Sequence, residues 1–223
     1  MPLMPPRSST PRLLDLFAGA GGSAYGYMQA GFHVTGVDHI LQPRYAGDAF
    51  VKADALTYLA QHGQAYDVIH ASPPCQGYSH CTPPHARERH PRLIPQVRAA
   101  CQRLGIPYVI ENVAGARKEM PGSFLMCGSM VGLPIWRHRY FETNAFPFPL
   151  MLACNHSVLP VLISGTFRRK GQHRRDYTVQ ERRAAIGIDW MSDKELDQAI
   201  PPAYTAWIGQ RLLATCDTLP LLV

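Results

Sequence analysis

A short apolar segment that ends at a cluster of glycines constrains the fold of this chain more than any other feature. Arg12 to Phe17 (RLLDLF) has the length of a buried strand, and Ala18-Gly19-Ala20-Gly21-Gly22 follows it directly. Glycines at such a point let the backbone turn sharply and approach a ligand closely, because they carry no Cβ. The segment therefore predicts a central strand, a tight turn and a helix over residues 23–30.

The same alternation of strands and helices continues along the first half of the chain. Apolar segments at 32–37, 50–53, 66–71 and 107–110 predict strands, and residues 55–61 and 93–104 have helical spacing. This order favours an α/β fold with an open, doubly wound, mostly parallel sheet, which binds ligands at the carboxyl ends of its strands. The residues that lie at those ends are Asp15–Gly22, Asp38, Asp54, Cys75 and Glu111.

The second half of the chain has weaker patterns. Residues 137–142 and 158–164 are predicted to be strands. Thr178-x-x-Glu181 and Ser192-x-x-Glu195 are capping boxes, which open helices. Pro202 begins a terminal helix with Ile208, Leu212 and Cys216 on one face.

Composition excludes several classes of protein. The 223 residues are 46% hydrophobic, and none of their apolar stretches reaches the roughly 18 residues that a spanning helix needs. Six cysteines without a C-x-x-C pair do not form a disulfide framework, so a reducing cytoplasm is expected. The net charge of +6 is compatible with a polyanionic partner and equally with solubility alone. Residues 1–11 have no leader-like apolar region and are predicted to be disordered.

Cys75 is the sharpest chemical signal. It follows Pro73-Pro74 at the end of a predicted strand and precedes Gln76-Gly77. A thiol at this point is a candidate nucleophile, although a single cysteine is more often a buried structural residue. Glu111-Asn112 ends the neighbouring strand, so a carboxyl group is expected beside the thiol. That pairing favours the nucleophile.

Two other features allow both a functional and a structural interpretation. The glycine turn with Asp38 fits a nucleoside site, in which the acid accepts ribose hydroxyls, but a tight turn and a helix cap would have the same residues. Cys127, Cys154 and His156 could be zinc ligands, but they lack a clear fourth partner and C-x-x-C spacing. We therefore favour small buried residues there and expect no metal.

Six segments, in order, resemble motifs of the cytosine C5 DNA methyltransferases, and the resemblance extends over nearly all of residues 12–213. The resemblance rests on Asp15-Leu-Phe-Ala-Gly-Ala-Gly-Gly22, Ser72-Pro-Pro-Cys-Gln-Gly-Tyr-Ser79, Glu111-Asn-Val113, Arg137-His-Arg139, Thr178–Trp190 and Ala199-Ile-Pro-Pro-Ala203.

The chain also departs from the family. Ile135-Trp136 stands where the family usually has a glutamine before the Arg-x-Arg pair, and Asp197-Gln198 stands where it usually has Gly-Asn. The region of 33 residues from Glu142 to Arg174 is far shorter than a typical recognition domain. A weak or very short sequence preference is therefore expected, supplied by this insert and by residues 76–92.

The resemblance implies transfer of a methyl group from S-adenosylmethionine, which becomes S-adenosylhomocysteine, to carbon 5 of a cytosine flipped out of double-stranded DNA. The Cys75 thiolate would attack carbon 6. Glu111 would contact ring nitrogen 3 and the exocyclic amine. Asn112 would hold the strand end, and Arg139, with Arg137, would bind the carbonyl oxygen. After transfer, a base would remove the carbon 5 proton and the thiol would be eliminated.

The resemblance also assigns binding residues. The cofactor set is Phe17, Ala18, Gly19, Ala20, Gly21, Gly22, Asp38, Asp54, Pro74 and Leu93, with Phe17 on the adenine, Asp38 on the ribose and Asp54 on the adenine amine. The nucleic-acid set is Gln76, Ser79, Arg87, Arg89, Arg92, Arg168, Arg169 and Lys170. The expected divisions are a core at 12–141, a recognition insert at 142–174 and a segment completing the core at 175–223.

Two alternatives remain open at this point. A branch of the family that acts on tRNA keeps the same motifs, so RNA is a possible substrate class. A catalytically silent nucleic-acid-binding relative would also keep the fold, and the altered residues at 135 and 198 motivate that hypothesis. A monomer without an obligatory protein partner, in a bacterial or phage-infected cytoplasm and associated with restriction-modification, is expected by analogy.

Overall fold

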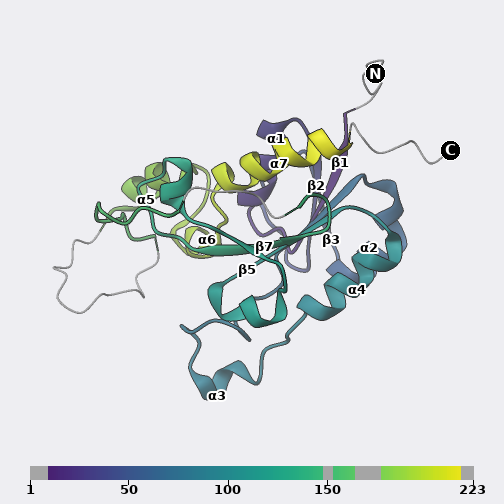
Figure 1. Ribbon diagram of the computed structural model, residues 1–223, viewed down its shortest axis with the longest axis horizontal. Helices are drawn as coiled ribbons and strands as arrows, with labels where there is room; N and C mark the ends of the chain where they lie inside the picture. Colours follow the sequence, from purple (N-terminus) through teal and green to yellow (C-terminus); the bar gives the residue numbers. More distant parts are fainter. Residues whose placement is uncertain (1–9, 148–152, 164–176, 217–223) are drawn as a thin grey trace.

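The structure, a computed structural model, describes residues 10–147, 153–163 and 177–216 (Figure 1). The expected disordered N-terminus therefore lies almost entirely outside the described residues. The elements are β1 (Arg12–Leu16), α1 (Gly22–Ala30), β2 (His33–Asp38), β3 (Ala49–Lys52), α2 (Ala55–His62), β4 (Val68–Ala71), α3 (Pro84–Arg87), α4 (Ile94–Leu104), β5 (Tyr108–Asn112), β6 (Phe124–Met126), β7 (Arg139–Thr143), α5 (Val179–Ile186), α6 (Asp193–Gln198) and α7 (Pro202–Cys216), with short 3₁₀ helices at Gly63–Ala65, Ala114–Glu119 and Gly128–Val131.

The described strands form a seven-stranded sheet in the order β3-β2-β1-β4-β5-β7-β6. Strands β1 to β5 pair in parallel, whereas β7 is antiparallel to both β5 and β6. This is the α/β fold typical of S-adenosylmethionine-dependent methyltransferases, so the predicted fold class is confirmed. Because β7 runs backwards, its first residue, Arg139, lies at the same edge of the sheet as the carboxyl ends of β4 and β5.

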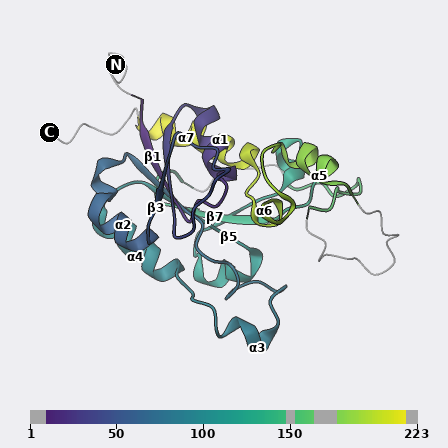
Figure 2. The ribbon, with the colours of Figure 1, turned by 180° about the vertical axis from the view of Figure 1, so that it is seen from behind.

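Helices cover both faces of the sheet, with α1 and α7 on one face and α2 and α4 on the other (Figures 1 and 2). Leu59 of α2 and Val97 of α4 are buried in a cluster with residues of β1, β4 and β5, and Tyr27 of α1 and Ile208 of α7 are buried in the cluster opposite. Gly26 lets α1 and α7 touch, because a Cβ there would lie 2.1 Å from the Pro202 carbonyl oxygen. Together α1 and α7 form the layer on this face of the sheet, and α1 follows directly on the glycine turn.

The remaining predictions about elements have mixed outcomes. Both capping boxes are present and open α5 and α6, as expected. Residues 158–163, in contrast, form no strand, so that prediction is wrong. The short β6 was missed because a segment of three residues carries too little periodicity to detect. Arg168, Arg169 and Lys170 lie outside the described residues.

Among the described residues, no helix combines the length and the apolar character that crossing a membrane requires.

Candidate active site

The glycine turn after β1 is held by a carboxylate at the end of the next strand. Phe17 and Gly19 both have left-handed backbone angles, with φ of 60° and 50°. The Gly19 amide donates to Asp38 Oδ2 at 3.0 Å, and the Ile40 amide donates to Asp38 Oδ1 at 3.0 Å. Asp38 therefore shapes the turn with both oxygens, and it caps no helix.

A tryptophan far along the chain supports the other side of this turn. Trp190 Nε1 donates to the Ala20 carbonyl oxygen at 2.9 Å, and its ring contacts Tyr25 of α1. The sequence analysis gave Trp190 no separate role, since it forms the end of a motif that carries no reacting group. The C-terminal segment thus helps to fix the predicted cofactor turn.

The turn leaves open space over Gly19, and a fully buried carboxyl group in β1 has unmet polar capacity. A Cβ built on Gly19 meets no atom within 4 Å. Asp15 is fully buried and accepts a hydrogen bond from Ser23 at 2.8 Å, but its Oδ1 has no partner among the described residues. Burial raises the pKa of Asp15 to about 7. These features suit a polar ligand.

The other predicted cofactor residues lie around the same edge of the sheet. Asp54 is exposed and caps α2 through hydrogen bonds from the Thr57 amide and hydroxyl, which lower its pKa. Phe17 and Leu93 pack, half-buried, against one core cluster, so both the base of the turn and the start of α4 contact the same apolar surface. The structure thus gives Asp54 a capping role independent of any ligand.

The loop that carries Cys75 is fixed at its start by two neighbouring strands. The Ser72 amide donates to the Leu16 carbonyl oxygen of β1 at 3.2 Å, which places the loop beside the glycine turn. Asn112 Nδ2 donates to the Pro73 carbonyl oxygen at 2.9 Å, and Asn112 Oδ1 accepts from the Val113 amide. Asn112 therefore ties the end of β5 to the Pro-Pro-Cys loop, the holding role expected for it.

Glu111 and Arg139 form an ion pair at this edge, with Arg139 Nε 2.9 Å from Glu111 Oε1. Both side chains are largely buried, at 7% and 15% exposed. Oε1 nevertheless accepts no well-directed hydrogen bond, because the Nε–H does not point at it. Burial raises the pKa of Glu111, and this effect outweighs the lowering by Arg139, Arg137 and Ser72. A buried carboxyl group with one unsatisfied oxygen is the result.

The Cys75 thiol lies within the electrostatic reach of this pair. Burial raises the pKa of Cys75, the charge of Glu111 raises it further, and Arg139 and Arg137 lower it. The charges of Glu111 and Arg139 therefore act on the Cys75 thiol in opposite directions. A neutral Glu111 beside Arg139 would favour the thiolate.

Arg137 makes contacts different from those expected. Its Nε donates to the Ala199 carbonyl oxygen at 2.9 Å and its Nη2 to the Asp197 carbonyl oxygen at 2.6 Å. Tyr204 Oη donates to the Arg137 carbonyl oxygen. Through these hydrogen bonds, Arg137 ties the segment before β7 to the residues around the end of α6.

A buried hydrogen-bonded chain that the sequence did not reveal leads toward Glu111. Tyr27 Oη lies 2.9 Å from His70 Nδ1, and His70 Nε2 lies 2.9 Å from Ser72 Oγ. Burial lowers the pKa of His70 to about 3, so the imidazole is neutral. His70 lies inside a predicted strand, where the sequence pattern does not distinguish a functional histidine from a structural one.

Residues 76–92 are anchored at one end. Arg92 pairs with Glu119, and its guanidinium lies 4.7 Å above the Tyr78 ring. Arg87 Nε donates to the Thr82 carbonyl oxygen at 2.9 Å. Gln76 Oε1, next to Cys75, is buried and has no partner among the described residues. Arg92 thus serves the loop itself, whereas Gln76 has unused acceptor capacity.

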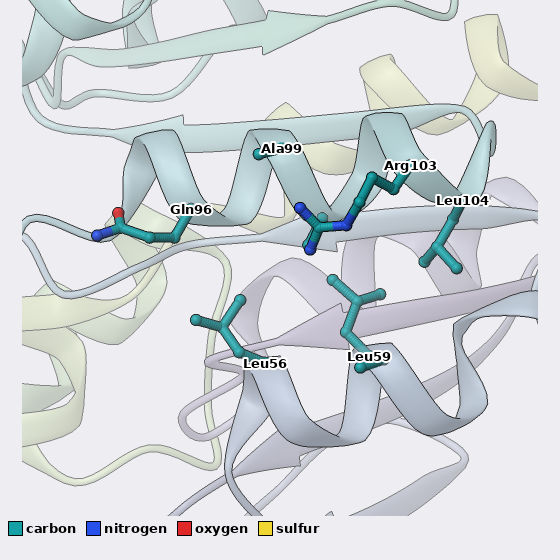
Figure 3. A pocket seen from close by; sticks show the side chains of 8 residues that line it. Leu56, Leu59, Gln96, Ala99, Arg103 and Leu104 are labelled. Carbon is teal, nitrogen blue, oxygen red and sulfur yellow. The ribbon is translucent and has the colours of Figure 1, made fainter.

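A cavity of about 410 Å³ lies between α2 and α4 (Figure 3). Leu56 and Leu59 of α2 face α4 across it, and Arg103 is the charged residue in its lining. None of the predicted site residues lines this cavity, so it is separate from the candidate active site.

Comparison with solved structures supports the fold. The chain is similar to the Entamoeba histolytica methyltransferase EhMeth, with 14% identity over 94% of this chain and 99% of that one and a TM-score of 0.59. Two weaker matches are a protein described as a DNA modification methyltransferase encoded within an E. coli prophage (22% identity, 69% of this chain, TM-score 0.46) and the S. pombe Dnmt2 methyltransferase (18%, 59%, 0.41). The chain spans 53% and 48% of the length of these two proteins.

No protein-family model matches the chain, and no curated protein sequence is significantly similar to it. At these identities, the similarity to solved structures establishes the fold, and the chemistry has to be argued from the site.

Proposed function

We propose that this chain is a DNA methyltransferase that transfers a methyl group from S-adenosylmethionine to carbon 5 of a flipped-out cytosine. The observation that carries the proposal is the buried Glu111–Arg139 ion pair, whose two charges act on the pKa of the Cys75 thiol. A nucleophile, an acid and a cation at one strand edge are the groups that addition to a cytosine ring requires.

The glycine turn fits the cofactor. The open space over Gly19 is suited to the amino-acid end, and Asp38 is suited to the ribose. When bound, S-adenosylmethionine would supply an electrophilic methyl group. Phe17, Pro74 and Leu93 would contact its apolar parts, and Asp54 its adenine amine.

Cys75 would act first. The thiolate sulfur forms a bond to carbon 6 of cytosine, and the electron pair of the 5,6 double bond moves so that carbon 5 becomes nucleophilic. After carbon 5 has gained the methyl group, a base removes its proton, the double bond reforms and the thiolate leaves. No net oxidation occurs.

Glu111 and Arg139 would stabilise the ring while the sulfur is attached. The raised pKa of Glu111 favours a protonated carboxyl group, which can donate to ring nitrogen 3 as that nitrogen gains electron density. Arg139 would bind the ring carbonyl oxygen. Asn112 and Arg137 hold the backbone on either side.

The target cytosine must leave the stacked duplex, which costs a few kcal/mol. We propose that Gln76 and Ser79 contact the opened duplex, and that Arg87, Arg89 and Arg92 bind phosphates. Arg168, Arg169 and Lys170 are further proposed phosphate contacts. To bind a phosphate, Arg92 would have to give up its ion pair with Glu119. The proposed setting is a cytoplasm that contains double-stranded DNA.

The test is mechanism-based trapping. Duplex DNA containing 5-fluorocytosine should form a covalent, denaturant-resistant adduct at Cys75 in the presence of S-adenosylmethionine, because the fluorine cannot be removed as a proton. Labelled methyl groups should enter duplex DNA and not tRNA. Labelling of tRNA alone would contradict DNA as the substrate. Binding of nucleic acid without any transfer would indicate a catalytically silent protein.

A further inference from the structure

Four potential metal ligands from three chain segments meet at the β6–β7 end of the sheet. Cys127 follows β6, His138 precedes β7, and Cys154 and His156 belong to the described segment 153–163. One ligand atom from each residue lies within 4.8 Å of the other three. The sequence analysis found three of these residues and expected no metal; the structure adds His138 as the fourth.

Two of the separations between ligand atoms match those of a tetrahedral zinc site. Bonds of about 2.0–2.1 Å to nitrogen and about 2.3 Å to sulfur place two nitrogens about 3.3 Å apart and a nitrogen and a sulfur about 3.6 Å apart. In the structure, His138 Nε2 lies 3.3 Å from His156 Nε2, and Cys127 Sγ lies 3.4 Å from His156 Nε2. A hydrogen-bonded pair of imidazoles would explain the first distance, but it would not bring two thiols to the same point.

The surroundings support ligation by neutral imidazoles and thiolates. The Ser129 hydroxyl donates to Cys127 Sγ at 3.3 Å, a contact that stabilises a negative sulfur. The Asn155 amide in turn donates to Ser129 Oγ at 3.1 Å. Trp136 stacks on the His156 ring with centroids 4.4 Å apart, which fixes the orientation of the imidazole.

The ligand set selects the metal. Two thiolates balance the charge of a divalent ion, and the absence of oxygen donors from the set disfavours magnesium and calcium. Four protein ligands leave no position for water or substrate, which is the arrangement of structural zinc.

We propose that Cys127, His138, Cys154 and His156 bind one structural zinc ion. The ion joins segment 153–163 to the ends of β6 and β7. Because His138 lies between Arg137 and Arg139, the ion also fixes the backbone that presents Arg139 to Glu111. The proposal does not depend on the reaction, since a zinc site of this kind would stabilise the same region in a catalytically silent protein.

The experiment measures metal content of the full chain, purified under reducing conditions and dialysed against metal-free buffer. We expect one zinc per chain by mass spectrometry. Replacement by cobalt(II) should give the intense visible bands of a tetrahedral ion and a thiolate charge-transfer band. Cys154→Ser and His156→Gln should each lose most of the metal, and a strong chelator should lower the melting temperature of the wild-type chain.

Matched controls are Cys81→Ser and His85→Gln, which change the same residue types away from the cluster and should retain one zinc. The cobalt spectrum of the wild-type chain requires no variant and so remains decisive if a variant fails to fold. Substoichiometric metal, an octahedral cobalt spectrum, equal zinc in all variants, or a Cys127–Cys154 disulfide in the reduced preparation would each overturn the proposal.

Discussion

Asp38 and Glu111 each lie at the carboxyl end of a parallel strand, yet their carboxyl groups differ in the hydrogen bonds that they accept. Both oxygens of Asp38 accept hydrogen bonds from backbone amides. Glu111 has one oxygen without a directed hydrogen bond, although the residue is only 5% exposed. A carboxylate whose two oxygens both accept hydrogen bonds shapes a loop without a ligand. A buried carboxyl oxygen without a hydrogen bond instead leaves an acceptor that a ligand can use. This difference is the basis on which we propose that Asp38 belongs to the cofactor-binding end and Glu111 to the reacting end.

Loss of the nucleophile is the strongest test of the reacting end. Cys75→Ala should reduce methyl transfer by at least about a thousandfold, because no other group can bond to carbon 6. Binding of S-adenosylmethionine, measured by calorimetry, should be preserved. Cys81→Ser is the control and should retain the wild-type rate. Wild-type transfer by Cys75→Ala would remove the thiol from the mechanism.

Glu111→Gln separates acid catalysis from the shape of the site. The amide keeps the size of the side chain but cannot transfer a proton, so the rate at saturating substrates should fall about 10²- to 10⁴-fold. Cofactor affinity should change little. A large loss of cofactor binding with a normal rate would assign Glu111 to the binding end and break the comparison.

Asp38→Asn should have the reverse signature. The neutral side chain weakens hydrogen bonds to the ribose and to the Gly19 amide, so the cofactor dissociation constant should rise about tenfold. The rate at saturating cofactor should stay near that of the wild type. Steady-state kinetics with varied cofactor would contradict this if the maximal rate fell and the affinity did not.

The pH dependence of Cys75 alkylation sharpens the difference further. The thiolate is the reactive form, and both burial and the charge of Glu111 raise the pKa of Cys75. Alkylation by iodoacetamide should therefore increase with pH, with a midpoint above that of an ordinary thiol. Glu111→Gln removes one of the raising contributions, so its midpoint should lie at lower pH. Peptide mass spectrometry at each pH would follow Cys75 alone, and an upward shift in the variant would show that Glu111 does not act on the thiol through its charge.

Asp54 gives the smallest expected effect. Asn is an equally good cap, so Asp54→Asn should leave the melting temperature unchanged, whereas Asp54→Ala should cost about 1 kcal/mol of stability. If Asp54 also binds the adenine amine, calorimetry should show that both variants bind the cofactor with several-fold lower affinity. Equal cofactor affinity in the wild type and both variants would show that Asp54 caps α2 and does not contact the cofactor.

Local pattern was enough to predict the strands of the first half, its helices except the short α3, and the residues at the strand ends. Short apolar segments predict the strands, and Asp38, Cys75 and Glu111 end or follow such segments. The rule that ligands bind at the carboxyl ends of parallel strands requires only the order of strands and helices. The same local information predicted both capping boxes. It failed for residues 158–163, because a short apolar segment has no period that separates a strand from an extended loop.

The Arg-x-Arg pair marks the limit of that method. Two residues separated by one would share a face if both belonged to a strand. Arg137 instead precedes β7 and donates to backbone oxygens near α6, while Arg139 opens β7 and pairs with Glu111. His138 between them meets Cys127 and His156. Spacing alone could not assign these three side chains to three different environments.

The sequence by itself determined which residues end or follow each strand, and hence the candidate nucleophile, the candidate acid and the glycine turn. The tertiary structure alone decided that β7 runs antiparallel, that Trp190 supports Ala20, and that four ligand-type side chains from three segments meet. The physical reason is range: periodicity and turn chemistry act over a few residues, whereas these contacts join segments whose approach depends on packing of the whole sheet and its helices.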